Sequence, residues 1–243
     1  MEKDNIIFGA HSINEALNEA VDIDKIHVNL TTKGKYNDIV SKAKAQHIKV
    51  SFVPHQKFKN YEHLNHQGIL AFVASISYRK LEETVEAILK ANPKPTFLLL
   101  DGITDVRNFG AIIRTAECTG IDAIIIPTQG SATITKETIK TSAGAAFKIP
   151  IIKVAHIKDA IFYLQSSGVE LIGASEKSDT SITKVNFNKA NGIIMGSEGK
   201  GIQPSILKML DVKAKIPMTG EINSLNVSVA CGMFLYENLK QKG

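Results

Sequence analysis

Five short, unbroken apolar runs in the C-terminal part of the chain constrain its fold most strongly. They occupy residues 97–100, 123–126, 149–152, 171–173 and 193–195. Such runs, without polar alternation, are typical of strands that are covered on both faces. Helical stretches separate them at residues 110–119, 136–141 and 157–166. The pattern predicts an α/β fold with a mostly parallel sheet and helices on both of its sides.

The first part of the chain predicts a smaller α/β domain. Strand-like runs and helical stretches alternate there, with strands at residues 6–8, 26–28, 50–53 and 68–74 and helices at 12–20 and 36–46. A short charged helix and two prolines, Pro93 and Pro95, come next, and proline ends a helix because it lacks the N–H donor. We therefore expect an N-terminal domain at residues 1–77, a linker at 78–95 and a second domain at 96–243.

The composition limits the classes of function. Hydrophobic residues make up 44% of the chain, which is enough for a sizeable core, and the formal net charge is +5. This mild basic excess fits a polyanionic partner such as RNA without demanding one. No apolar run reaches the roughly 18 to 20 residues of a membrane span, and the N-terminus lacks a signal-peptide pattern. We expect a cytoplasmic protein with no membrane partner.

Neither disulfide nor metal chemistry is expected. Cys118 and Cys231 lie in apolar helical patterns, where reduced thiols are ordinary core residues. His63 and His66 have a spacing that resembles a metal pair, but no cysteine or carboxylate ligand accompanies them. The histidines and lysines of the N-terminal loops are candidate phosphate contacts. For any one of them a solvated surface position is the alternative.

Three polar loops follow predicted strands and form the candidate functional site. They span residues 101–110, 196–201 and 216–226. In open parallel sheets, ligands bind beyond the carboxyl ends of the strands, so these loops are expected to converge on one crevice. The glycines of the second loop are spaced as G-x-x-G-x-G, which is neither the Walker A motif nor the dinucleotide-binding fingerprint.

The third loop carries more polar side chains than the start of a helix requires. Asn223, Ser224 and Asn226 precede a helix whose apolar face begins at Val227. Either Ser224 or Asn226 can cap this helix, because a side-chain oxygen accepts the free N–H groups of the first turn. One such residue would suffice for capping. The excess therefore indicates a site.

Taken together, the three loops resemble a known family. The stretches NFGAIIR at 108–114, IMGSEG at 194–199, and IPM at 216–218 continuing to SLNVS at 224–228 are similar to motifs of the SpoU (TrmH) family. Members of this family are RNA ribose 2′-O-methyltransferases of the SPOUT superfamily. Residues 5–77 are similar to the substrate-binding domain of its RlmB branch, notably at FGAH, 8–11, and HQG, 66–68.

This resemblance implies a fold, a cofactor and a partner. The C-terminal domain would be a SPOUT α/β-knot, in which the chain threads through itself as a deep trefoil that holds S-adenosylmethionine. The small N-terminal α/β domain would bind RNA. Family members work as homodimers. Carried over residue by residue, the cofactor would contact Met195, Gly196, Ile216, Ser224 and Leu225.

The resemblance also assigns catalytic roles. The residues that would act on RNA are Asn108, Arg114, Glu198, Ser224 and Asn226. Arg114 would hold a phosphate next to the target ribose and stabilise a developing alkoxide, since arginine stays protonated and is a poor base. Asn226 and Ser224 would orient the ribose, and Glu198 would orient Arg114 or Asn108. Capping or turn formation is the alternative role for each of them.

The implied function is 2′-O-methylation of a guanosine in 23S ribosomal RNA with S-adenosylmethionine as methyl donor. The extra N-terminal domain favours this substrate. The alternatives are a tRNA guanosine methyltransferase, an rRNA adenosine methyltransferase, and a non-catalytic RNA-binding assembly factor that kept the fold. The expected partner is 23S rRNA, either as naked RNA or in a ribosome precursor.

Overall fold

The computed structural model describes residues 6–19, 21–73, 76–221 and 224–243. Their contacts divide the chain into two compact units, residues 1–77 and 78–243, which are described separately. Among the described residues, none of the helices is both long enough and apolar enough to cross a membrane.

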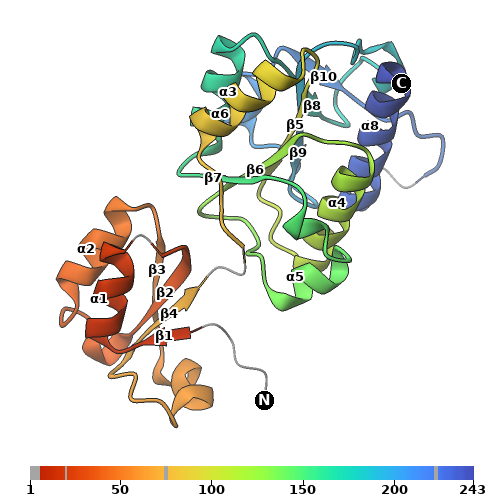
Figure 1. Cartoon of the computed structure of the whole chain (residues 1–243). Coiled ribbons are helices and arrows are strands. Elements are labelled where there is room, and N and C mark those ends of the chain that lie inside the picture. The colour runs from red at the N-terminus through yellow and green to blue at the C-terminus, as the bar shows by residue number, and fades with distance from the viewer. Residues whose placement is uncertain (1–5, 20, 74–75, 222–223) are drawn as a thin grey trace. The chain divides into compact units, whose positions relative to one another are not determined.

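The first unit is a four-stranded sheet with two helices on one face (Figure 1). Its elements are β1 (Ile6–Phe8), α1 (Ala10–Asn18), β2 (Ile23–Asn29), α2 (Asn37–Ala45), β3 (Lys49–Val53) and β4 (Ile69–Val73), with short 3-10 helices η1 (Leu30–Thr32) and η2 (His55–Tyr61). The strand order is β1-β4-β2-β3, and only β2 and β3 run parallel. Buried Ile13 and Leu17 of α1 belong to one hydrophobic cluster with Ile26 of β2 and Ile69 of β4.

The second unit contains a larger sheet between two layers of helices. Its strands are β5 (Thr96–Asp101), β6 (Ala123–Pro127), β7 (Ile151–Val154), β8 (Glu170–Ala174), β9 (Asn191–Gly196) and β10 (Val212–Ala214). Its α-helices are α3 (Leu81–Ala91), α4 (Val106–Cys118), α5 (Lys136–Thr141), α6 (Ile157–Ser166), α7 (Pro204–Leu207) and α8 (Val227–Lys242), and η3 (Ala145–Phe147) and η4 (Ile182–Lys184) are 3-10 turns.

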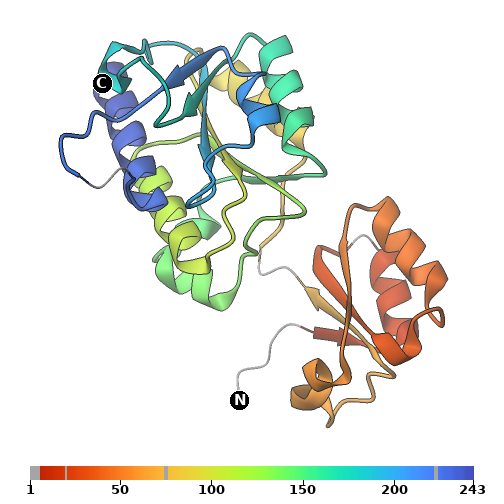
Figure 2. The same ribbon diagram turned by 180° about the vertical axis from the view of Figure 1, so that it is seen from behind.

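The larger sheet has the order β10-β8-β9-β5-β6-β7, and every neighbouring pair is parallel. Helices α3 and α6 lie on one face, and α4, α5 and α8 lie on the other (Figures 1 and 2). Strand β5, in the middle, is buried over its whole length, as its unbroken apolar run predicts. The predicted α/β architecture is therefore confirmed.

Residues 78–95, which the sequence predicts to be a linker, belong instead to the second unit. Leu81 and Val85 of α3 are buried in the core of that unit, beside Ile161 and Leu164 of α6. The helix is amphipathic, because Leu81, Val85 and Ile88 are four and three residues apart and lie on one face. The charged residues that suggested a linker lie on the opposite face, toward solvent.

The two cysteines differ in environment. Cys231 of α8 is fully buried, and this burial raises the pKa of its thiol to about 12. Cys118, which the sequence predicts to be a core residue, is exposed at the last position of α4. The buried face of α4 consists of Phe109, Ile112 and their helical neighbours, and position 118 lies outside it.

Candidate functional site

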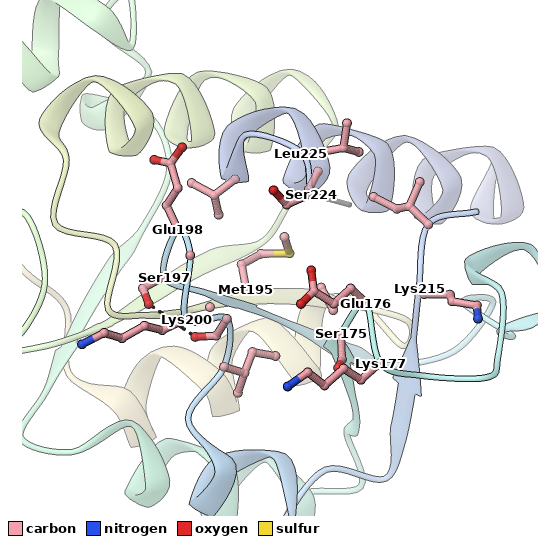
Figure 3. A pocket seen from close by; sticks show the side chains of 18 of the residues that line it. Ser175, Glu176, Lys177, Met195, Ser197, Glu198, Lys200, Lys215, Ser224 and Leu225 are labelled. Carbon is pink, nitrogen blue, oxygen red and sulfur yellow. Dashed lines mark hydrogen bonds between the residues drawn. The ribbon is translucent and has the colours of Figure 1, made fainter. Parts of the chain in front are cut away.

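A cavity of about 470 Å³ opens at the carboxyl ends of β8, β9 and β10. Its walls come from residues 174–177 after β8, 195–202 around the end of β9, 214–218 after β10, and the start of α8. Figure 3 shows the side chain of Met195 in the middle of this pocket, between Ser224 and Glu176. Its position agrees with the rule that parallel sheets bind ligands beyond their carboxyl strand ends.

All five residues predicted to contact a cofactor line this cavity: Met195, Gly196, Ile216, Ser224 and Leu225. Met195 is almost fully buried, and Ile216 and Leu225 add apolar surface from the segment before α8. The volume lies in the range of about 300 to 1,000 Å³ that is usual for small-molecule sites. Apolar walls with backbone close by suit an adenine ring and its hydrogen-bonding edge.

The loop after β9 folds back sharply over the strand end. A Cβ atom on Gly196 would lie 2.0 Å from backbone atoms of Gly201 and Ile202, so only glycine fits there. Ser197 and Gly201 exchange two backbone hydrogen bonds of 3.1 and 2.9 Å, which close the loop. This loop carries Glu198 at the edge of the cavity.

A buried carboxylate holds the far end of the same loop. Asp101, the last residue of β5, is only 3% exposed. It accepts hydrogen bonds from the backbone N–H of Gln203 at 2.9 Å and from the Gln203 side-chain amide at 2.8 Å. The glycine loop is therefore anchored at both ends.

Three predicted catalytic residues from three different loops form one hydrogen-bonded chain. The Asn226 amide donates to Oδ1 of Asn108 at 3.0 Å, and the Asn108 amide donates to a carboxylate oxygen of Glu198 at 3.1 Å. Asn108 lies in the first turn of α4, which Asp105 caps by accepting from the N–H groups of residues 107 and 108. Glu198 thus orients Asn108, one of the two partners expected for it.

Asn226 has two roles at once. Its Oδ1 accepts from the backbone N–H of Ser228 at 2.9 Å, so it is the N-cap of α8, and its amide faces Asn108. Ser224 is not the N-cap of α8 and instead lines the cavity. Asn223 lies outside the described residues.

Arg114 stands apart from this chain of hydrogen bonds. It lies on α4 six residues after Asn108, about 9 Å further along the helix axis. Its side chain is exposed and has no hydrogen-bond or ion-pair partner among the described residues. Arg114 therefore does not contact Glu198, and its guanidinium is available to a ligand.

The sequence prediction missed the charged rim of the cavity. Ser175, Glu176 and Lys177 follow β8. Lys200 lies in the loop after β9, and Lys215 lies in the segment after β10. In Figure 3, Glu176 points into the pocket, whereas Lys200 and Lys215 point outward. The strand-end rule applied to residues 171–173 would have indicated residues 174–177. They carry no glycine motif that draws attention.

In the part of the chain that the structure describes, histidine, cysteine and acidic side chains form no metal site. Over the described ranges, no group of three or more such residues is placed to hold a metal ion. His66 instead accepts a hydrogen bond from the backbone N–H of Gly68 at 2.9 Å, and His55 pairs with Asn29 at 3.0 Å.

Known proteins match both units. The profile of the SpoU rRNA methylase family matches residues 95–236. The chain belongs to this family. A second profile, RNA 2′-O ribose methyltransferase substrate binding, matches residues 6–79. The chain is therefore a SpoU-family RNA methyltransferase with a substrate-binding domain in front of its catalytic domain.

Relatives match over nearly the whole chain. A protein of Staphylococcus epidermidis assigned to the TrmH family of tRNA/rRNA methyltransferases is 34% identical, over 99% of this chain and 97% of its own length. A counterpart from Staphylococcus saprophyticus is 33% identical, over 98% of this chain and 96% of its own length.

Solved structures of RNA methyltransferases have a similar fold. The SpoU methyltransferase AviRb from Streptomyces viridochromogenes, in complex with the cofactor AdoMet, matches with a TM-score of 0.63 and 18% identity over 98% of this chain and 90% of its own. An AdoMet-bound rRNA methyltransferase from Sinorhizobium meliloti matches with a TM-score of 0.61 and 24% identity, over 97% and 86%.

Proposed function

We propose that this SpoU-family enzyme transfers a methyl group to the 2′-hydroxyl of a guanosine ribose in 23S ribosomal RNA. The observation that carries this proposal is the hydrogen-bonded chain of Asn226, Asn108 and Glu198 beside the strand-end cavity. A structural cap or turn needs no amide that bridges two loops. A fixed set of donors and an acceptor at a pocket suits the alignment of a substrate hydroxyl.

S-adenosylmethionine is the methyl donor, and the cavity fits it. Met195, Ile216 and Leu225 provide apolar walls, Gly196 lets backbone approach closely, and Glu176 places a carboxylate where an amino group could bind. When bound, the cofactor supplies an electrophilic methyl group on a sulfonium. The carboxylate is complementary to the positively charged groups of the cofactor, and the apolar walls are complementary to its adenine ring.

The chain's own residues position the RNA. Arg114 binds the phosphate next to the target ribose through its planar fork and stabilises the negative charge that develops on the ribose oxygen as the 2′-hydroxyl proton passes to water. Ser224 and Asn226 orient the ribose, while Glu198 keeps the Asn108 amide fixed. Much of the rate acceleration then comes from alignment, which is worth about 7 to 11 kcal/mol in well-oriented reactions.

The substrate-binding domain supports ribosomal RNA as the substrate. A TrmH/SpoU tRNA modifying enzyme from A. aeolicus, 26% identical, covers 67% of this chain, so about a third of the chain has no counterpart in it. An added RNA-binding domain suits a target inside a large RNA. We propose a cytoplasmic location, because bacteria such as the staphylococci of the relatives modify their ribosomal RNA in the cytoplasm, and the mild positive charge of the chain fits such a partner.

The proposal is tested by methyl transfer. Labelled methyl groups from S-adenosylmethionine are offered to 23S rRNA and to bulk tRNA that lack their native modifications, and the modified nucleotide is mapped. Label on one 23S guanosine ribose is the expected result. Label on tRNA or on an rRNA adenosine would correct the substrate and keep the reaction. No label, with no cofactor binding by calorimetry, would favour the non-catalytic assembly factor.

Asn226→Asp separates the two roles of Asn226. Aspartate is an equally good N-cap, so the melting temperature should stay nearly unchanged. An aspartate at position 226 has no N–H group to donate to Oδ1 of Asn108. If the Asn108 amide flipped in order to donate to the aspartate, its oxygen would face the Glu198 carboxylate and lose that hydrogen bond. Turnover should therefore fall about tenfold, the scale of one lost hydrogen bond. Steady-state methylation and thermal melting measure both effects. Unchanged turnover would leave Asn226 with capping alone.

We also propose that the enzyme is a homodimer with a trefoil-knotted catalytic domain. Helix α8 carries a stripe of exposed apolar side chains on the face away from the core: Val229, Met233, Tyr236 and Leu239. An apolar stripe of this kind suits burial against a second copy about a two-fold axis. The knot is supported by the path from β10, at one edge of the sheet, to α8, which packs on α4.

Replacing Met233 and Tyr236 with lysine should convert the dimer to a monomer. Both side chains are exposed in the single chain, at 44% and 64%, so the fold should survive, while four lysines brought together across a two-fold axis would repel each other. Sedimentation velocity measures the change. Phe162→Lys on α6, equally exposed at 63%, is the matched control and should leave the oligomeric state unchanged. A dimer that persists in the double variant would place the interface elsewhere.

A further inference from the structure

Among the described residues, no α-helix lies on one face of the first unit's sheet, although the 3-10 helix η2 approaches it through Tyr61, and Leu70 on this face is fully buried. Helices α1 and α2 lie on the opposite face, where they pack on Ile26, Val28 and Ile69 (Figure 1). Side chains alternate along a strand, so the neighbours of those apolar residues point to the other face. There, the strand register places Ile6, Phe72, Lys25 and Lys49 in one row across the four strands. The next row is Phe8, Leu70, His27 and Ser51. We call the surface of Lys25, His27, Lys49, Ser51 and Phe72 the open face.

Positive charges gather around His27 on the open face. Lys25 and Lys49 pair in the neighbouring row of the sheet, and Lys57 of η2 also acts on the charge of the imidazole. Partial burial and the positive charges of Lys25, Lys57 and Lys49 lower the pKa of His27 to about 4. The imidazole is therefore neutral at pH 7, and the three lysines share a region that favours an anion.

An aromatic ring lies among these lysines. Lys25 Nζ is 4.8 Å from the centroid of the Phe72 ring, and the His27 ring meets it edge-on at 4.9 Å. Tyr61 of η2 approaches the same ring at 6.2 Å between centroids. Phe72 itself is only partly buried. The accessible part of the Phe72 ring is a surface on which a base can stack.

We propose that the open face binds a single-stranded stretch of the RNA substrate, with a base stacked on Phe72 and phosphates held by Lys25, Lys49 and Lys57. Aromatic residues on a sheet face that carries no α-helix can read unstacked bases, and a double-stranded RNA presents none. Lysines beside the ring then follow the backbone of the strand. The inference rests on the proposed function, because it assumes that the substrate is RNA.

The test measures RNA binding by the full chain without methyl donor. The probes are a fluorescein-labelled unstructured oligoribonucleotide of about 12 nucleotides, within the usual site sizes, and the corresponding RNA duplex. Fluorescence anisotropy should show tighter binding of the single strand. Lys25→Gln with Lys49→Gln should weaken it about tenfold and lower the salt slope by about 1.4, since each phosphate contact contributes about 0.7. Phe72→Leu, which keeps apolar volume without the ring, should weaken it about fivefold or more.

Two lysines on the opposite side of the unit provide the matched control. Lys42 and Lys44 of α2 are both exposed, and changing both to glutamine removes the same charge. This variant should bind the single strand nearly as tightly as the unchanged protein. An equal loss in the control, an unchanged salt slope, a preference for the duplex, or no RNA binding at all would overturn the inference.

Two further measurements show that the variants are folded and that the replaced lysines lie close to His27. In the variant with Lys25 and Lys49 replaced, the pKa of His27 measured by NMR should rise from about 4, because two neighbouring positive charges are gone. Calorimetric binding of S-adenosylmethionine should stay unchanged, since the cavity is in the other unit. If the open-face variants bind RNA as tightly as the unchanged protein, and the unchanged protein transfers methyl groups, the open-face inference is wrong and the proposed function stands. If the variants bind RNA more weakly but the unchanged protein transfers no methyl group, the proposed function is wrong and the open-face inference stands.

Discussion

Arg114→Ala is expected to reduce methyl transfer about 100- to 1,000-fold, the usual cost of removing one group that stabilises developing negative charge. The fold should be unaffected, because the side chain is exposed and has no partner among the described residues. Stability should change by no more than about 0.5 kcal/mol, as for other surface positions. Single-turnover methylation and denaturant unfolding measure the two effects. S-adenosylmethionine binding should persist, since Arg114 does not line the cavity.

Two further variants show whether the shape of the guanidinium matters. Arg114→Lys keeps the charge but loses the bidentate fork, so it should recover only a small part of the activity. Arg107→Ala is the control on the same helix: Arg107 is exposed, and its ion pair with Glu137 at 3.7 Å lies at the surface. It should keep nearly full turnover. If Arg107→Ala were as damaging as Arg114→Ala, the phosphate contact would be misplaced.

The order of the larger sheet could not be predicted from the sequence. Each apolar run indicates a buried strand, and four of the five lie in the strands β5, β6, β8 and β9, while the run at 149–152 overlaps β7. The pairing of β5 with β9 joins segments almost a hundred residues apart, and nothing local specifies it. Strand β10 has only three residues, too few for a periodic signal.

Part of the candidate site follows from the sequence and part does not. The strand-end rule predicts that the loops holding Asn108, Glu198 and Asn226 meet, and the hydrogen bonds between these side chains show that they do. The same rule gives no partner for Arg114, since a position six residues along a helix is far from the loop in space. The Asp101 to Gln203 anchor was not predicted either, because its two ends are far apart in the chain.

Gly196→Ala is expected to abolish S-adenosylmethionine binding and methyl transfer together. The added Cβ would lie 2.0 Å from backbone atoms of Gly201 and Ile202, and backbone cannot move aside as a flexible side chain can. The loop that carries Glu198 would have to lift from the end of β9, although Asp101 still holds its far end at Gln203. The resulting strain should cost about 1 to 3 kcal/mol of stability, as overpacking of a core usually does.

Gly220→Ala separates this effect from a general loss of glycine flexibility. Gly220 lies in the segment between β10 and α8, its backbone has no positive φ, and a Cβ there would meet no atom of the described residues within 4 Å. This control should bind the cofactor normally in calorimetry and melt at the same temperature or slightly higher, because alanine restricts the unfolded chain. If Gly196→Ala also bound the cofactor normally, the loop would be able to shift without deforming the cavity. The close approach of Gly196 to Gly201 would then serve packing at the strand end and have no part in shaping the site.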